Sequence, residues 1–322
     1  MQIRHYIASD APAVLRLWNT AGVRAGYAPQ DEEGLCRLLL KHPDFSTAHT
    51  FVLEEEGRLC GFVNGCTGDH LAHGAVRGYV SCLLLNSEHD TDESAFALLS
   101  ALEDSFRAAG KSASAVTFFN PIRLPWIIPG TPGHQHNNMP GIPHDLPLYQ
   151  RMLKSGYREG ATEMAMYLDL SDYRYPDSLL EKEKAMAADG YTVAPYQPDL
   201  HVGLEEMLAA LGNSMWSSEI PSAAKAGQYL LVGLKGNTVA GFTGPVYPEP
   251  TGRGYFAGIG VAPAYEKHGL GTLLFNRLCL AEREHGAQYM SLFTGTENPA
   301  QRIYRAAGFT PRRYFAVMIK EL

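Results

Sequence analysis

The stretch VAPAYEKHGLGT, residues 261–272, decides the fold of the C-terminal half of the chain. Residues 255–261 are rich in glycine and β-branched side chains and predict a strand that leads into it. The sequence that follows, TLLFNRLCLAEREHG, carries leucines at helical spacing and predicts a helix. Gly269 and Gly271 allow a tight turn in which backbone N–H groups and the positive end of the helix dipole point inward. A strand, a glycine loop and a helix start in this order predict a site for a pyrophosphate group.

A second patterned segment follows this helix. A short apolar strand is predicted at residues 289–293, and TENPAQRIYRAAGF after it predicts a short helix. Asn298 is placed to cap that helix, Tyr304 lies on it, and Gly308 ends it. Glycines before a helix also serve turns and packing, so the loop by itself leaves a purely structural interpretation open. The two segments in this order, about 30 residues apart with a helix between them, are much more specific.

Together the two segments resemble motifs A and B of the GNAT superfamily, the acyltransferases that use acetyl-CoA. The family loop is usually written Arg or Gln, any, any, Gly, any, Gly or Ala, and this chain has EKHGLG at residues 266–271. Glu266 therefore departs from the pattern at its leading position. That position contributes mainly its backbone, but a carboxylate that faces a phosphate weakens cofactor affinity unless Lys267 or His268 compensates.

The resemblance implies which residues hold the donor. It implies that the strand before the loop pairs with the pantetheine arm as an extra strand would, and that the backbone of the loop holds the pyrophosphate. It also implies that Asn298 contacts the cofactor amides, although a helix cap explains this residue equally well. The residues predicted to bind acetyl-CoA are Ile259, Gly260, Val261, Glu266, Lys267, His268, Gly269, Leu270, Gly271, Thr272 and Asn298.

Tyr304 matches the family tyrosine and is the predicted catalytic residue. A phenol with a pKa near ~10 is suited to protonating a thiolate whose parent thiol has a pKa near ~8.5. The alternative is a core aromatic ring whose hydroxyl reaches solvent. No motif marks the general base, and the candidates are Glu219, Glu249, Tyr255 and Glu297.

The chain contains the same sequence pattern twice. FVLEEEGRLCGF at residues 51–62 and LVGLKGNTVAGF at residues 231–242 both predict a strand, a tight turn and a strand that ends in Gly-Phe. RMLKSGYREG at residues 151–160 and RIYRAAGFTPR at residues 302–312 both predict a helix that ends at a glycine. We therefore expect an α/β fold of two tandem GNAT-like domains, each with a central mixed, mostly antiparallel sheet flanked by helices.

The expected boundaries place a degenerate GNAT-like domain at residues 1–170 and a catalytic GNAT domain at residues 191–322. Residues 171–190 form the linker between them. A charged helix is predicted within the linker at residues 177–188, because Pro and Asp precede it and a glycine follows.

The first copy is predicted to be degenerate because it lacks both chemical features of the second. Alignment on the glycines that end the helices places Asp92 and Glu93 where the second copy has its glycine loop. The same procedure places Met152 opposite Tyr304. Acidic side chains would repel a pyrophosphate, so we expect the first copy to act as a scaffold that shapes the substrate cleft.

Residues 121–147 form a long segment rich in proline and glycine, which excludes a regular helix or a central strand. His134, His136 and His144 lie in it, but no cysteine or suitably placed carboxylate completes a metal site. We expect no metal and interpret the segment as a wall of the substrate site or an interdomain contact.

The composition limits partners and location. The net charge is −7, with no block of Lys or Arg, which argues against nucleic acid or an anionic membrane as partner. The five cysteines include no CxxC pair and are expected to be free thiols. No signal-like segment begins the sequence and no apolar run reaches the ~20 residues of a membrane span, so we expect a cytoplasmic protein.

The function predicted from these features is direct transfer of an acetyl group from acetyl-CoA to a primary amine of a small molecule, in the C-terminal domain. Trp216 is expected to line the acceptor site or else to belong to the core. One alternative is an acyl- or aminoacyltransferase with a larger donor. Another is a noncatalytic CoA-binding sensor. The chain is expected to be a monomer or a homodimer.

Overall fold

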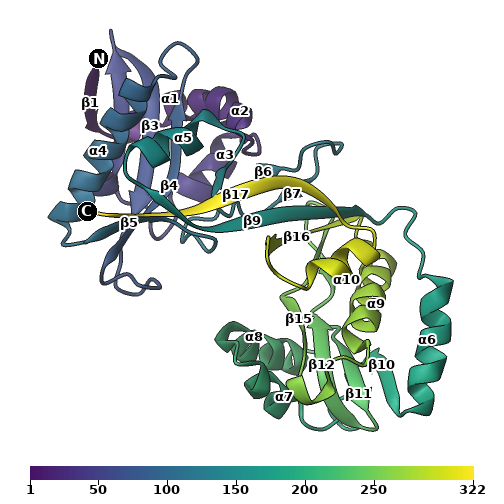
Figure 1. The fold of residues 1–322 in the computed structure, drawn as a ribbon. Coiled ribbons are helices and arrows are strands. Elements are labelled where there is room, and N and C mark those ends of the chain that lie inside the picture. Colours follow the sequence, from purple (N-terminus) through teal and green to yellow (C-terminus); the bar gives the residue numbers. More distant parts are fainter. The chain divides into compact units, whose positions relative to one another are not determined.

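The structure is a computed structural model that describes residues 1–322. The chain forms two compact units (Figure 1). Unit 1 consists of Met1–Ala165, Phe293–Glu297 and Arg312–Leu322, and unit 2 consists of Met166–Leu292 and Asn298–Pro311. Two segments that were expected in the C-terminal domain, residues 293–297 and 312–322, make their contacts in unit 1.

Unit 1 is built on a mixed sheet. Its strands are β1 (Gln2–His5), β2 (Thr50–Glu55), β3 (Arg58–Cys66), β4 (Arg77–Leu85), β5 (Ala113–Val116), β17 (Thr310–Glu321) and β9 (Arg158–Asp169), in this order across the sheet. Neighbours from β1 to β4 are antiparallel, β4 and β5 are parallel, and β17 is antiparallel to β5. Strand β17 enters from the far end of the sequence and places Met318 opposite Val116.

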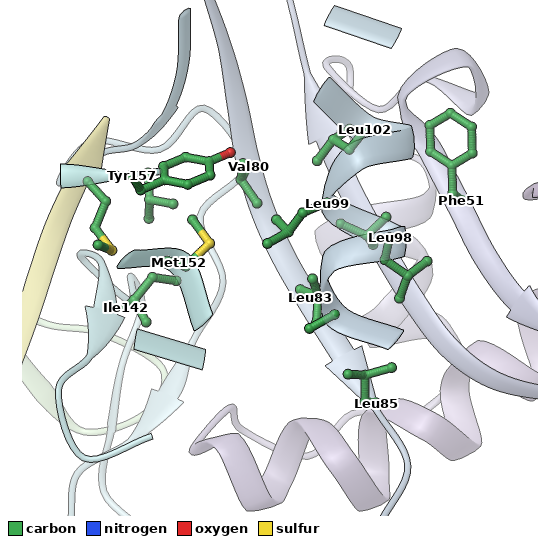
Figure 2. Close-up of a cluster of buried hydrophobic side chains, with 14 of the residues drawn as sticks. Phe51, Val80, Leu83, Leu85, Leu98, Leu99, Leu102, Ile142, Met152 and Tyr157 are labelled. Atoms are coloured by element: carbon green, nitrogen blue, oxygen red, sulfur yellow. The ribbon is translucent and has the colours of Figure 1, made fainter. Parts of the chain in front are cut away.

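Helix α4 (Asp92–Ala108) supplies the apolar side chains that cover this sheet. Its apolar residues recur at helical spacing, and the side chains on that face are buried. Figure 2 shows three of them, Leu98, Leu99 and Leu102, within a core cluster that also contains Met152 and Tyr157. The helices of unit 1 are α1 (Ala11–Leu17), α2 (Val23–Ala25), α3 (Glu32–Leu35), α4 and α5 (Pro147–Lys154).

The proline- and glycine-rich segment, residues 121–147, is a folded part of unit 1. Short strands β6 (Trp126–Ile127) and β7 (Gln135–His136) pair antiparallel, and β8 (Ile142–Pro143) pairs with β17. The indole of Trp126 is fully buried and donates a hydrogen bond of 3.0 Å to the Asn138 carbonyl. The chain contains no group of three or more His, Cys, Asp or Glu side chains that could hold a metal ion.

Unit 2 contains two sets of paired strands. The first is an antiparallel sheet of β10 (Tyr191–Pro195), β11 (Leu231–Lys235), β12 (Thr238–Gly244) and β15 (Gly258–Val261), in this order. The second has the order β9, β16 (Tyr289–Gly295), β14 (Arg253–Tyr255) and β13 (Tyr247–Pro248). Strands β14 and β16 are parallel, whereas β13 and β14 are antiparallel. Each unit therefore combines helices with a mixed set of strands, as expected.

Five helices belong to unit 2. They are α6 (Asp177–Ala188), α7 (Leu204–Leu211), α8 (Ser214–Lys225), α9 (Leu270–Glu284) and α10 (Gln301–Ala306). Helix α6 has the bounds predicted for the linker helix. Helix α9 buries Leu273, Leu274 and Leu278, whose spacing contributes to its prediction. No helix of the chain is both long enough and apolar enough to span a membrane.

The two repeated hairpins share a shift in strand register at the same position. In the β2–β3 hairpin, Leu53 faces Gly61 and the register shifts at the next residue. In the β11–β12 hairpin, Gly233 faces Gly241 and the register again shifts at the next residue. A β-bulge is a specific structural feature, so its recurrence at the same place supports one unit used twice.

Candidate functional site

The strand that leads into the glycine loop changes partners along its length. Its first part, β14, pairs with β16, with Arg253 opposite Tyr289 and Gly254 opposite Met290. Its second part, β15, pairs with β12 instead. The two sets of strands therefore separate at residues 256–257, and the edge of β15 that faces away from β12 has no partner strand. An extended ligand can add to such an edge through main-chain hydrogen bonds.

The glycines of β15 make room for side chains of the neighbouring helices. A β-carbon at Gly260 would lie 2.4 Å from Leu211 Cδ1, and one at Gly258 would lie 2.6 Å from the Trp216 ring. In the structure these glycines allow close packing against α7 and α8. The predicted cofactor residues Ile259, Gly260 and Val261 are half-buried along this strand.

The loop between β15 and α9 presents unpaired backbone donors. Gly269 precedes α9 with a φ of 88°, a left-handed conformation that favours glycine. No side chain caps α9, and the backbone N–H groups of residues 267–271 donate no hydrogen bond within the chain. The N–H groups of Thr272 and Leu273, by contrast, bond to the Gly269 carbonyl. Free donors at the positive end of a helix dipole are suited to binding a pyrophosphate.

The side chains of the loop are turned to solvent. Glu266, Lys267 and His268 are exposed, and no ion pair joins Glu266 to either neighbour. The His268 ring stacks on Tyr191, with 4.9 Å between ring centroids. The predicted compensation of the Glu266 charge by Lys267 or His268 is therefore not visible as a direct contact.

Gly271 and α10 are close neighbours. A β-carbon at Gly271 would lie 3.4 Å from Ile303 Cδ1 and 3.7 Å from Val261 Cγ2. A methyl group fits this space, but a long charged side chain would have to enter the mouth of the loop. Leu270, the first residue of α9, is buried.

Tyr304 lies on α10 with its ring in the core of unit 2. The ring centroid is 4.8 Å from that of Phe275 on α9 and 6.4 Å from that of Phe309. The side chain is 8% exposed, and burial raises the pKa of its phenol. Its hydroxyl makes no hydrogen bond within the chain. The ring is thus a core aromatic, and the catalytic role of the hydroxyl stays a prediction.

Asn298 acts as a local cap. Its side-chain oxygen accepts a hydrogen bond of 2.9 Å from the Ala300 N–H, at the start of α10. The residue is exposed, and its amide nitrogen has no partner in the chain. The side-chain oxygen of Asn298 is used in the cap, and its amide nitrogen is free to donate a hydrogen bond to a ligand.

Helix α8 brings two side chains to the place where β14 and β15 separate. Trp216 donates a hydrogen bond of 3.1 Å from Nε1 to the Ala257 carbonyl. One turn later, Glu219 accepts a hydrogen bond of 2.6 Å from the Tyr255 hydroxyl. Burial, followed by this hydrogen bond, raises the pKa of Tyr255. Tyr255 therefore stays protonated, and Glu219 is the acceptor of the pair.

The other two base candidates lie in different environments. Both oxygens of Glu249 accept hydrogen bonds from Arg253, at 2.7 and 2.9 Å, and Arg253 is buried. This carboxylate is used in an internal ion pair. Glu297 is exposed and belongs to unit 1.

Sequence reasoning missed a buried carboxyl group on α9. Glu282 is fully buried, and neither of its oxygens has a hydrogen-bond partner. Burial raises its pKa from 4.5 to about 9, against the opposing effect of Arg253. The charged run LAEREHG in which it stands is typical of a solvent-exposed helix face, whereas in the structure Glu282 packs against Gly254 on β14.

Comparison with known proteins identifies the fold. Residues 200–309 match the model of the Acetyltransferase (GNAT) family. No curated protein matches the chain by sequence. Solved structures match its fold over almost the whole length.

Three solved structures illustrate the likeness. A GCN5-related glucosamine N-acetyltransferase region of a fungal multi-domain GH3 beta-N-acetylglucosaminidase has a TM-score of 0.67 and 17% identity, and the match covers 99% of this chain and 38% of that one. A GCN5-related N-acetyltransferase from Sphaerobacter thermophilus has a TM-score of 0.61 and 15% identity, with 99% and 95% covered. A tandem GNAT protein from the clavulanic acid biosynthesis pathway has a TM-score of 0.58 and 16% identity, with 99% and 98% covered. At these identities the likeness shows a tandem GNAT fold and does not specify a substrate.

Proposed function

We propose that this chain, which has a tandem GNAT fold and matches the GNAT family model at residues 200–309, transfers an acetyl group from acetyl-CoA to a primary amine of a small molecule. Catalysis is assigned to unit 2. The observation that carries the proposal is the start of α9, where unpaired backbone donors follow a strand with an open edge.

The donor side fits the parts of acetyl-CoA. The N–H groups of residues 267–271 are free to hold the pyrophosphate. The open edge of β15, at Ile259, Gly260 and Val261, can pair with the amide-bearing pantetheine arm. Acetyl-CoA supplies a thioester whose carbonyl carbon forms a bond to the amine nitrogen as the carbon–sulfur bond breaks and the electron pair leaves on sulfur.

Tyr304 is proposed as the general acid. The leaving thiolate takes the phenolic proton, and solvent returns a proton to the phenolate. Because burial raises the pKa of Tyr304, the phenol is in its protonated form at neutral pH, which is the form that can donate to the thiolate. Its hydroxyl has no competing partner in the chain, so no internal hydrogen bond must break first.

Glu219 is proposed as the general base on the acceptor side. An amine reacts only as the neutral form, so the incoming ammonium group must give up a proton. The Glu219 carboxylate is half-buried and held by Tyr255 at the separation of β14 and β15. The same charge favours a cationic amine as substrate.

Calorimetric titration with acetyl-CoA, combined with turnover measurements, tests this proposal. We expect one site per chain, and we expect Gly271→Glu to abolish binding because a carboxylate enters the mouth of the loop. Tyr304→Phe should bind acetyl-CoA unchanged but lower kcat by about 100-fold, since only proton transfer is lost.

Tyr196→Phe is the matched control, because it removes the hydroxyl of a half-buried tyrosine of unit 2 to which no role is assigned. It should match the unmodified protein in both assays. Unchanged acetyl-CoA binding in Gly271→Glu would show that the cradle is elsewhere. Tight binding without thiol release across a broad panel of amines would favour a sensor.

A further inference from the structure

The linker helix α6 places a lysine over the start of α9. A β-carbon at Gly269 would lie 2.3 Å from Lys182 Nζ and 2.5 Å from its Cε. The ammonium group is therefore adjacent to the residue that precedes α9. The sulfur of Met186, one turn further along α6, would lie 3.9 Å from the same β-carbon. Helix α6 packs against β10 (Figure 1).

The position of Lys182 is fixed by its neighbour in the sequence. Glu183 accepts a hydrogen bond of 2.7 Å from Arg277 Nε on α9 and one of 2.6 Å from the Tyr175 hydroxyl. The Arg277 guanidinium also lies 4.2 Å from the centre of the Tyr175 ring. Met186 is buried. These contacts attach α6 to α9 on both sides of Lys182.

The charge on Lys182 has no counterpart in the chain. The carboxylates beside it are both engaged, Glu181 with Lys184 and Glu183 with Arg277. Glu266 forms no ion pair with it. A cation near the N-terminus of a helix is unfavourable, because the dipole there is also positive. An anion placed between the ammonium group and the N–H groups of residues 267–271 would turn this repulsion into attraction on both sides.

We propose that Lys182 binds the pyrophosphate of the donor that occupies the α9 cradle, so that the linker helix forms one wall of the cofactor site. This inference rests on the proposed function. It also gives a reason why Glu266 is tolerated in the loop, since a cation for the phosphates comes from α6. Lys182 is a binding residue and takes no part in proton transfer.

The test uses the full chain, the variant Lys182→Ala and the matched control Lys184→Ala. Lys184 lies two residues away on the same helix, is exposed, and pairs only with exposed Glu181, so its removal has little effect of its own. Calorimetry with acetyl-CoA should show about tenfold weaker binding for Lys182→Ala and unchanged binding for Lys184→Ala. Lys182→Arg should recover most of the affinity.

Two further probes separate this site from the proposed chemistry. Inorganic pyrophosphate should compete with acetyl-CoA in the unmodified protein and lose affinity in Lys182→Ala. Acetyl-pantetheine lacks the phosphates, so its kcat/KM should be the same in both lysine variants and in the unmodified protein.

The outcomes are distinguishable. Equal affinity for acetyl-CoA and pyrophosphate in both lysine variants overturns the role of Lys182 and leaves the proposed function intact. Selective loss of pyrophosphate binding in Lys182→Ala, in a chain that does not bind acetyl-CoA, supports the Lys182 anion site and overturns the proposed function. A loss with acetyl-pantetheine equal to that with acetyl-CoA also overturns the inference, because the effect then lies outside the phosphates.

Discussion

Helices α4 and α9 occupy equivalent places in the two units, yet they begin in opposite ways. In unit 1, the Thr91 side chain accepts a hydrogen bond of 3.2 Å from the Ser94 N–H and caps α4. In unit 2, Gly269 precedes α9 and no side chain caps it. The first residue of α4, Asp92, also accepts hydrogen bonds from Arg151 and Lys154, at 3.0 and 2.8 Å.

The difference shows how one fold serves two purposes. Donors at a helix start can bond to the chain or to a ligand, and a side chain that takes them stabilises the helix at the expense of the site. Unit 1 uses the acidic start of α4 for internal ion pairs. Unit 2 leaves its donors free. At the place where unit 2 has its glycine loop, unit 1 thus has a threonine cap and an acidic side chain held by two cations.

The contact between a strand glycine and the following helix also differs between the two units. A β-carbon at Gly78 on β4 would lie 2.4 Å from the Phe106 ring of α4. A β-carbon at Gly254 on β14 would lie 2.8 Å from Glu282 Oε2 of α9. The same glycine-to-helix contact is therefore apolar in unit 1 and carries an unpaired carboxyl group in unit 2. The unit with the proposed site tolerates the less stable arrangement.

The largest expected effect comes from breaking the ion pairs at the start of α4. Arg151 is 9% exposed and bonds to both Asp90 and Asp92. Arg151→Ala removes the buried cation and its charged hydrogen bonds and leaves only the more exposed Arg24 and Lys154 beside the two carboxylates, and it should lower the free energy of unfolding by about 3 kcal/mol. Urea unfolding measures the loss, and hydrogen exchange in α4 shows whether unit 1 is the part that loosens.

Lys154→Ala is the control for this prediction. It removes an exposed cation from the same Asp92 and should cost less than about 1 kcal/mol. Neither variant should add a second acetyl-CoA site, because the acidic side chains remain. Equal losses in the two variants would mean that the burial of Arg151 does not matter to unit 1.

Glu282 gives the next effect, which depends on pH. Its folded pKa of about 9 lies above its ordinary value of 4.5, so the folded state holds this proton more tightly. The stability it confers is complete below about pH 4.5 and is lost as the pH rises toward 9. Between about pH 6 and pH 8 the loss is about 1.4 kcal/mol per pH unit.

Glu282→Gln cannot ionise and should lack this slope. Unfolding free energies of both proteins, measured across that pH range, should diverge as the pH rises, with the variant gaining relative to the unmodified chain. Arg253 and Glu249 face Glu282 and are present in both proteins, so their own titration contributes equally to the two unfolding free energies. Parallel curves would show that Glu282 ionises without penalty in the folded state.

Much of the architecture could be predicted from local patterns. The repeated Gly-Phe hairpins, the bounds of α6 and the glycine that ends each short helix follow from turn residues and spacing. The partner of β17 could not be predicted. An alternating strand at the end of the chain fits the edge of many sheets, and no residue in it marks β5 as its neighbour.

The sequence predicts features of the backbone near the candidate site better than contacts between distant side chains. Two glycines before a helix predict the free backbone donors of residues 267–271, and their use as a phosphate cradle stays a prediction. Lys182 stands in the run EKEK, which resembles any solvated helix face, and Glu282 stands in a similarly charged run. Only tertiary packing brings Lys182 over Gly269 and buries Glu282 against Gly254.

The smallest effect is expected from the cap itself. Thr91→Ala removes the side-chain oxygen that accepts from the Ser94 N–H and should lower the free energy of unfolding by about 1 kcal/mol. Thr91→Ser keeps the hydroxyl and should stay close to the unmodified protein. Calorimetry on Thr91→Ala should still find one acetyl-CoA site, because Asp92 and Glu93 keep negative charge at the start of α4. A second site in that variant would mean that the cap alone, and not the acidic first turn, separates unit 1 from unit 2.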